Sequence, residues 1–315
     1  MKLIKCLLVA IFAIASVSAD AQELKKKVLA IGDFTYSNSF YREDVDFVRN
    51  QIIKAVQNTG RVVVVDQDNS TQEELRAESE RRKQESAMDA NEVANMVSLN
   101  SNSILVANLD QLSVTTETYE DVEYVKGGDG KTQKRVKGRY KYLKGVFTYT
   151  VKITDCETGM VQAQQTFSVT DGGIDYQTFE SKYKTANEVR EGLMRRCVNG
   201  DQFKVLILNT FKSEGKILQV EEGSAKKAKT VYVSLGSEDG VEVKQVLEVY
   251  KVLDIAGEFS KKLIGEAEII EMLGPSRCLV KIKKGGEDIQ QVIASGGELI
   301  VQTRNVKMKY FGGVK

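Results

Sequence analysis

Apolar runs and helical spacings alternate along the N-terminal part of the chain. Short apolar runs predict buried strands at residues 27–34, 61–66 and 103–109. Between the first two runs, apolar side chains recur at helical spacing at Val45, Val48, Ile52 and Val56. Acidic residues precede this stretch and a glycine follows it, which is typical of an amphipathic helix. The order predicts a β-α-β unit whose first strand leads into a loop at Gly32-Asp33.

Farther along, the pattern changes from helical spacing to a period of two. Further helices are predicted at 70–85, which opens with a capping-box pattern, at 90–97 and at 188–198. Apolar residues alternate with polar ones at 147–153 and again at 161–169, with a turn at 155–159 between them. This alternation predicts an antiparallel hairpin packed on one face. The last helix closes the unit, with Val189, Leu193 and Cys197 on its buried side.

The C-terminal part differs in kind, because short strands follow one another there without a convincing long helix. The predicted strands cover residues 231–235, 246–252, 263–270, 278–282 and 298–302. Glycine-bearing turns separate them, which is typical of a small β-barrel or sandwich. We therefore expect an α/β domain at 22–200, with a mixed sheet and flanking helices, followed by a small all-β barrel-like domain at 201–315.

Residues 1–21 have the pattern of a cleavable signal peptide. Lys2 and Lys5 flank the start of an apolar run, and Ala19-Asp20-Ala21 supplies the small residues that a signal peptidase needs. The run is shorter than the roughly 20 apolar residues of a membrane helix, which disfavours a transmembrane anchor. A lipid anchor on Cys6 is disfavoured as well, because no small residues precede that cysteine. We expect an exported protein.

Composition narrows the classes of function. The chain has 45 basic and 44 acidic residues, so no global charge attracts nucleic acid or an anionic membrane. It has no histidine, which removes the commonest general base, the usual hydrolase triads and the commonest metal ligand. We expect no enzyme activity, no metal and no cofactor. The cysteines beyond the signal peptide, Cys156, Cys197 and Cys278, allow at most one disulfide, and buried thiols are the default interpretation.

Three short motifs imitate functional sites. Gly130-Lys131-Thr132 resembles the end of a phosphate-binding loop, but Val125 stands where that motif needs its first glycine. Residues 66–70 resemble the start of a calcium loop that lacks its glycine and its terminal glutamate. Asp33 ends the first strand, where α/β proteins often place function, but no glycine-rich fingerprint or base accompanies it. We interpret all three as structural.

The most unusual segment is the charged stretch between residues 116 and 144. Four acids, from Glu117 to Glu123, come first, and basic residues follow across Gly127-Gly128-Asp129-Gly130. One interpretation is a solvated hairpin with cross-strand charge pairs. The other is a finger that contacts an anionic partner, and both can hold together. The candidate partner-binding residues are Lys134, Arg135, Lys137, Arg139, Tyr140 and Tyr142.

Several motifs carry a resemblance to a known family. They are the opening strand KVLAIGDF, the V-V-x-D strand ending at Asp66, the strand SILVANL and the hairpin around D-x-x-T-G at 155–159. In this order they resemble the N-terminal domain of the curli-secretion lipoprotein family, CsgG, shared by the activator LpoB and the middle domain of FlgT, over about residues 27–197. Residues 236–250 resemble, more weakly, the C-terminal barrel of FlgT. The resemblance implies a role in the bacterial envelope without catalysis by this domain.

We therefore expect a non-enzymatic assembly or binding protein of the periplasm or the outer-membrane periphery. Its partners would be envelope proteins or glycans and not nucleic acid, with any membrane association peripheral and a homo-oligomer left open. The alternative is an oligomeric outer-membrane secretion pore subunit of the curli type. Two departures weigh against it: the chain lacks the acylated cysteine, and neither alternate set of residues in 116–144 is apolar throughout, as a lipid-facing strand requires.

The signal-peptide pattern predicts that the mature protein begins at Gln22 and is released from the envelope by osmotic shock. Intact-mass measurement and N-terminal sequencing of the released protein check this prediction. An uncleaved or lipid-modified N-terminus would contradict it.

Overall fold

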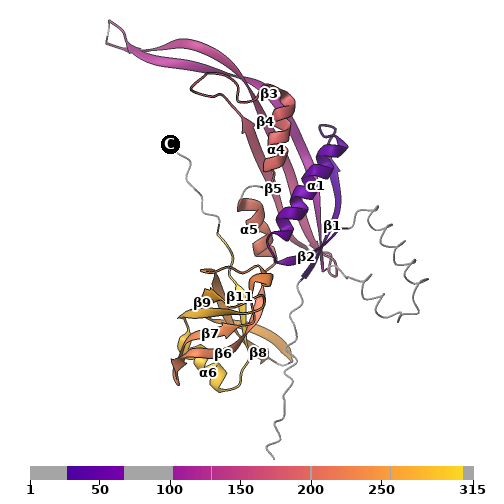
Figure 1. Ribbon diagram of the computed structural model, residues 1–315, viewed down its shortest axis with the longest axis vertical. Coiled ribbons are helices and arrows are strands. Elements are labelled where there is room, and N and C mark those ends of the chain that lie inside the picture. The colour runs from indigo at the N-terminus through magenta and orange to yellow at the C-terminus, as the bar shows by residue number, and fades with distance from the viewer. Residues whose placement is uncertain (1–26, 67–101, 129, 199–200, 256, 308–315) are drawn as a thin grey trace, which may run out of the picture.

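The computed structural model describes residues 27–66, 102–128, 130–198, 201–255 and 257–307 (Figure 1). The predicted signal peptide and the helices predicted at 70–85 and 90–97 lie outside the described residues. The described part builds two hydrophobic cores, one under a sheet and one inside a barrel. The two predicted types of architecture, a mixed sheet with helices and a small barrel, are confirmed, while the domain boundary after residue 200 stays a prediction.

A five-stranded mixed sheet forms the first unit, in the order β2-β1-β3-β4-β5. Its strands are β1 (Lys27–Tyr36), β2 (Val62–Asp66), β3 (Ser103–Lys126), β4 (Thr132–Asp155) and β5 (Val161–Gly172). β1 pairs in parallel with β2 and β3, and β3, β4 and β5 pair antiparallel. The predicted β-α-β unit and the predicted hairpin are both confirmed.

Helices cover one face of this sheet (Figure 1). They are α1 (Arg42–Gln57), α4 (Ala186–Arg196) and α5 (Asp201–Thr210). The α1 side chains at the predicted helical spacing, Val45, Val48, Ile52 and Val56, are buried, as are Val189, Leu193 and Cys197 at α4. The first two of these helices begin with a favourable contact: the Asp44 carboxylate accepts a hydrogen bond from the Tyr41 amide at 2.9 Å, and Thr185 Oγ1 accepts one from the Glu188 amide at 3.3 Å.

Two details of the first strands differ from the prediction. Gly32-Asp33 is not a loop, because β1 continues to Tyr36 and pairs with β3 on both sides of a register shift between Ile31 and Phe34. β2 is an edge strand, so Val63 is 40% exposed instead of buried. An apolar run shows that a strand forms, but its place in the sheet decides how many of its faces are covered.

The turn between β4 and β5 is held by one carboxylate. Asp155 Oδ1 accepts hydrogen bonds from the Thr158 amide at 2.8 Å and the Glu157 amide at 3.0 Å. These bonds, led by the one from Thr158, favour the ionised form and hold the pKa of Asp155 below its ordinary value. Gly159 follows with φ 71°, a conformation that glycine adopts without a steric cost. The D-x-x-T-G motif is thus a turn motif.

The second unit is a closed barrel in the order β10-β7-β6-β11-β8-β9. Its strands are β6 (Glu214–Ser224), β7 (Lys227–Val233), β8 (Val246–Ile255), β9 (Glu258–Met272), β10 (Cys278–Lys284) and β11 (Leu299–Thr303). The unit is not all-β, because α6 (Gly286–Ala294) packs Ile289 and Val292 into the barrel core. β6 was missed because most of its side chains are exposed or half-buried and give no clear alternation. α6 was missed because nine residues are too short for a clear helical period.

Buried groups in both cores fit the cysteine prediction. Cys197 and Cys278 are buried free thiols, and burial raises the pKa of each to about 12. The backbone carbonyl of Cys197 accepts a hydrogen bond from the buried Tyr149 hydroxyl. Cys156 is exposed in the β4–β5 turn. None of the described helices combines the length and the apolar character needed to cross a bilayer.

The packing of α4 on β4 predicts that Gly145→Ala destabilises the protein. A methyl group at Gly145 would lie 2.5 Å from Val189 Cγ1 and 2.6 Å from Leu193 Cδ1, so these side chains or the helix that carries them would have to shift. We expect a loss of about 1–3 kcal/mol in the free energy of unfolding. Urea titration followed by circular dichroism measures it. The control is Gly128→Ala, where a methyl group meets nothing within 4 Å. Equal stabilities of the two variants would contradict the prediction.

Candidate functional site

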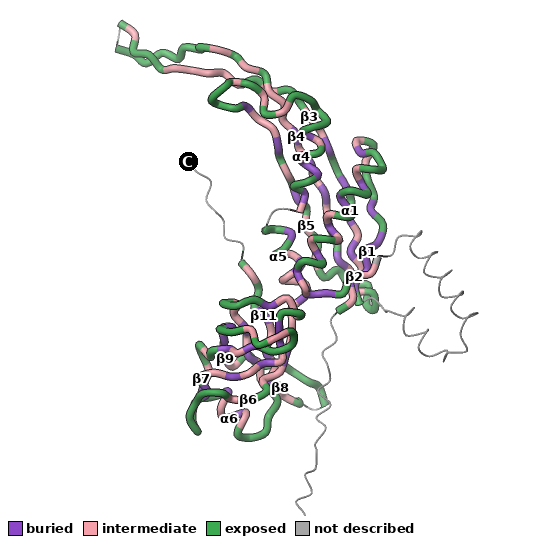
Figure 2. Tube along the Cα trace, viewed as in Figure 1, coloured by how far each residue is buried: buried purple, intermediate pink, exposed green. Residues whose placement is uncertain are grey.

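The charged stretch singled out in the sequence forms a two-stranded arm. The pairing of β3 with β1 ends at Leu109, and the pairing of β4 with β5 ends at Lys144. Beyond these ends β3 and β4 pair with each other, from Thr116↔Leu143 to Lys126↔Thr132. We call residues 116–126 and 132–143 the arm. Figure 1 shows the arm at the opposite end of the molecule from the barrel, and Figure 2 shows that its residues are exposed or of intermediate burial.

Charge pairs bridge the two strands of the arm on both of its faces. Glu120 accepts from Arg139 Nε at 3.0 Å and from Lys134 Nζ at 3.2 Å. Glu123 lies three residues farther along the strand and therefore points to the other face, because side chains alternate between the two faces. It pairs with Lys137 at 3.0 Å and with Arg135 at 3.7 Å. Nearer the sheet, Glu117 pairs with Lys144 at 3.1 Å. The predicted cross-strand charge pairs are confirmed.

The pairs change the protonation equilibria of the acids. Hydrogen bonds from Lys134 and then Arg139 hold the pKa of Glu120 below its ordinary value. A hydrogen bond from the Tyr142 hydroxyl at 2.6 Å, followed by one from Lys144, does the same for the pKa of Glu117. The same carboxylate raises the pKa of Tyr142 by accepting its proton in a hydrogen bond. The carboxylates of Glu117 and Glu120 are therefore ionised at neutral pH.

An aromatic cluster fixes the arm at its root. It consists of Tyr119 and Tyr140 from the arm and Tyr176 and Phe179 from the loop at 173–185. Tyr140 stacks on Phe179 with 4.7 Å between ring centroids, and Tyr119 meets Tyr176 edge-on at 5.4 Å. Phe179 has φ 57°, which is unfavourable for a bulky residue and costs about 1–2 kcal/mol. The stacking offsets part of this cost and joins the arm to the loop at 173–185.

The tip of the arm exposes apolar side chains. Tyr124 is 70% exposed, and Val125 and Val136 are 38% and 40% exposed. The turn beyond them is closed by hydrogen bonds from the Gly127 amide to the Lys131 carbonyl at 2.8 Å and from the Gly130 amide to the Gly127 carbonyl at 2.9 Å. Gly130-Lys131-Thr132 therefore lies in a hairpin turn and at the start of a strand, which is not the strand-to-helix setting of a phosphate-binding loop.

The six predicted contact residues divide into two groups. Lys134, Arg135, Lys137 and Arg139 lie together in the middle of the arm, each paired with an acid of β3. Tyr140 and Tyr142 lie at the root, where stacking and a hydrogen bond occupy them. Sequence reasoning missed Tyr124 at the tip, although an aromatic residue among charged ones is itself an indication of a contact residue. It also missed Phe179, whose contact with Tyr140 joins segments distant in sequence.

Comparisons with known proteins do not identify a family. No family model matches the chain, and no curated protein matches it. Among solved structures, the hypothetical protein CT253 from Chlamydia trachomatis matches at 13% identity and TM-score 0.28, covering 58% of this chain and 98% of that one. The PelC dodecamer from Paraburkholderia phytofirmans matches at 12% identity and TM-score 0.27, covering 55% of this chain and 86% of that one. Lipoprotein GNA1162 from Neisseria meningitidis matches at 8% identity and TM-score 0.27, covering 55% of this chain and 96% of that one. Such low scores carry no argument about function, so the resemblance to the curli-secretion family stays a prediction.

The lowered pKa of Glu120 predicts how the arm responds to acid. A carboxylate whose folded pKa is depressed stabilises the folded arm above its unfolded pKa, and this contribution is lost as pH falls through the folded pKa. Side-chain carboxyl ¹³C NMR should therefore give Glu120 a titration midpoint below 4.5. Replacing Lys134 and Arg139 by Met should raise the midpoint, whereas Lys126→Met near the tip should not. An unchanged midpoint in the double variant would contradict the pairing.

Proposed function

We propose that the protein is a non-enzymatic assembly or binding component of the cell envelope that holds a protein or glycan partner with its arm. The observation that carries this proposal is the arm itself, a hairpin of paired strands that continues beyond the sheet and its helices. A two-stranded hairpin is at best marginally stable in water and gains nothing for the core by extending into solvent. Its length and its root cluster are explained by a contact made away from the body of the protein.

The chemistry of the arm indicates the kind of partner. The arm together with its turn and Lys144, residues 117–144, holds eight basic and five acidic residues, a net charge of +3. The cross-strand pairs neutralise part of the charge locally and fix the register, so the excess attracts an anionic surface over a distance of about one Debye length. The exposed tip residues then supply apolar contact area. Among the described strands, the outer edges of the arm pair with no third strand and offer backbone hydrogen bonds to an added one.

The pore subunit gains no comparable support. Glu120 and Glu123 lie on opposite faces of the arm, each with two cationic partners. Neither face is therefore a continuous apolar row such as a lipid-facing strand needs. The envelope location rests on the signal-peptide pattern and on the resemblance to the curli-secretion family.

The test uses a photo-crosslinking amino acid in place of Tyr124, followed by crosslinking in cells and identification of the captured partner. Replacing Lys134, Arg135, Lys137 and Arg139 by Gln should weaken binding of that partner by roughly three- to tenfold near 0.1 M salt, and the difference should shrink at higher salt. The fold should survive, because exposed ion pairs contribute little to stability.

A matched control carries the same change in charge on the barrel. Lys226, Lys229, Lys262 and Lys281 are exposed there, and their replacement by Gln should leave capture unchanged. Equal capture by the arm variant and the parent protein would refute the proposed role of the arm. Stepwise conductance of the purified parent protein in planar bilayers would favour the pore instead.

A further inference from the structure

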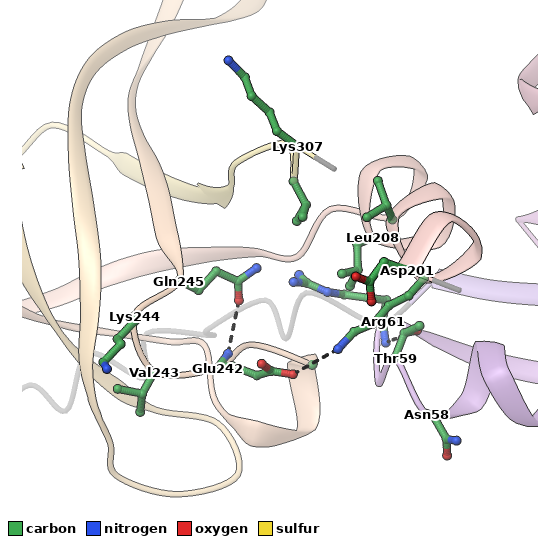
Figure 3. Close-up of a pocket in the computed structure, with 14 residues that line it drawn as sticks. Asn58, Thr59, Arg61, Asp201, Leu208, Glu242, Val243, Lys244, Gln245 and Lys307 are labelled. Carbon is green, nitrogen blue, oxygen red and sulfur yellow. Dashed lines mark hydrogen bonds and ion pairs between the residues drawn. The ribbon is translucent and has the colours of Figure 1, made fainter. Parts of the chain in front are cut away.

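A second candidate site lies far from the arm, where the sheet unit meets the barrel. A cleft of about 540 Å³ opens there, lined by side chains from both units (Figure 3). Arg61 precedes β2, Lys204 and Leu208 come from α5, and Glu242 and Gln245 come from the barrel. The lining combines charged and apolar groups, which is typical of sites for small organic molecules.

Arg61 is the unusual group in this cleft. Its residue exposure is 5%, and its Nη1 donates hydrogen bonds to the hydroxyls of Ser213 at 2.5 Å and Thr303 at 3.2 Å. Its buried Nε has no hydrogen-bond partner, and no carboxylate of the described residues forms an ion pair with this guanidinium. Burial lowers the pKa of Arg61 to about 10, while the charges of Asp239 and Glu242 oppose that shift in part. The side chain is thus a buried cation with neutral partners.

The remaining charges of the cleft compensate this cation only in part. Three lysines line it, Lys204, Lys244 and Lys307, against two acids, Asp201 and Glu242. Lys204 Nζ lies 3.6 Å from Glu242 Oε1 and forms an ion pair with that carboxylate. With Arg61 included, the lining holds four cations and two anions. The lining of the cleft therefore carries a net positive charge, and Arg61 is its most buried cation.

The backbone adds an independent sign of a built site. Lys244 has φ 72°, one of only two positive values among the described residues other than glycine. A long side chain in this conformation is strained, and such strain persists only where the surroundings impose it, commonly at ligand sites. Here the Lys244 amide donates to the Ile269 carbonyl at 2.8 Å, and the neighbouring Glu242 amide donates to Gln245 Oε1 at 3.2 Å. These bonds hold the lysine at the rim of the cleft.

We propose that this cleft binds a small organic anion bearing a carboxylate or a phosphate group, which compensates Arg61 and contacts the sheet unit and the barrel together. A planar carboxylate and a tetrahedral phosphate each present two oxygens that match the fork of a guanidinium, and the lysines of the lining add positive charge. A buried charge without an opposite charge beside it raises the free energy of the folded protein, so an anion at the Arg61 guanidinium lowers that free energy. A ligand that touches both units also stabilises their packing.

The experiment uses the mature protein and two probes, inorganic phosphate and succinate, at an ionic strength held constant with chloride. Calorimetry should show saturable binding of at least one probe, and which one binds separates the phosphate class from the carboxylate class. Arg61→Gln should weaken the binding about tenfold or more, because a hydrogen-bonded charge pair is lost. The pair Lys244→Gln and Lys307→Gln should weaken it about two- to fivefold through lost attraction. Lys229→Gln, on the barrel surface, is the control and should bind as the parent protein does.

Three results would overturn the proposal: no saturable binding of either probe, affinity unchanged in a folded Arg61→Gln variant, or an equal loss of affinity in the Lys229→Gln control. The first would mean that Arg61 only pins the two units through Ser213 and Thr303. The others would mean adventitious binding to surface lysines. If Arg61→Gln fails to fold, the exposed lysine pair decides the question alone. None of these results affects the role proposed for the arm, which shares no residue with the cleft.

Discussion

The rest of the structure depends on one continuous ladder of hydrogen bonds between β3 and β4. The two strands pair from Ser103↔Asp155 in the core to Lys126↔Thr132 at the tip, with shifts in register only at Leu109/Gln111 and at Asp121/Val122. In the core half, side chains such as Phe147 and Tyr149 are buried under the helices. In the outer half the helices no longer cover the strands. The same backbone pairing continues there, with charged and aromatic side chains in place of the core residues. The core thereby fixes the register of a surface that has no core of its own.

The arm compensates for its missing third strand in two ways. At its root, stacked rings bury apolar surface between Tyr140 and Phe179, which lie on separate segments. Along its length, acids of β3 face cations of β4 on both faces. Exposed pairs of this kind add little stability, but a slip by one residue would oppose like charges or separate the partners. The charges therefore contribute more to register than to energy, and they leave a surface of defined shape for a partner.

The junction between the sheet unit and the barrel follows a different principle. Glycines allow close approach there: a methyl group at Gly240 would lie 2.1 Å from the Thr59 carbonyl oxygen. Next to this contact, Arg61 crosses from the sheet unit to hydroxyls at the start of β6 and the end of β11. A buried cation with hydroxyl partners is an expensive way to join two units if joining them were its only role. The arm and the junction cleft are thus two separate places at which this fold departs from the simplest stable arrangement.

The sequence by itself determined the elements whose signal is local. The helical spacing from Val45 to Val56, the alternation on β4 and β5 and the turn at Asp155 each lie within one short segment, and the structure confirms them. The sequence also indicated the charged hairpin, because its acids and bases are separated along the chain.

Only the tertiary structure decided how far β3 and β4 extend, that Tyr140 belongs to the root and that α6 fills part of the barrel core. It also buried the side chain of Arg61, which in the sequence is only the polar first residue of a predicted strand. Its partners Ser213 and Thr303 lie 152 and 242 residues away. Burial and pairing between such distant residues are set by packing, which no local pattern records.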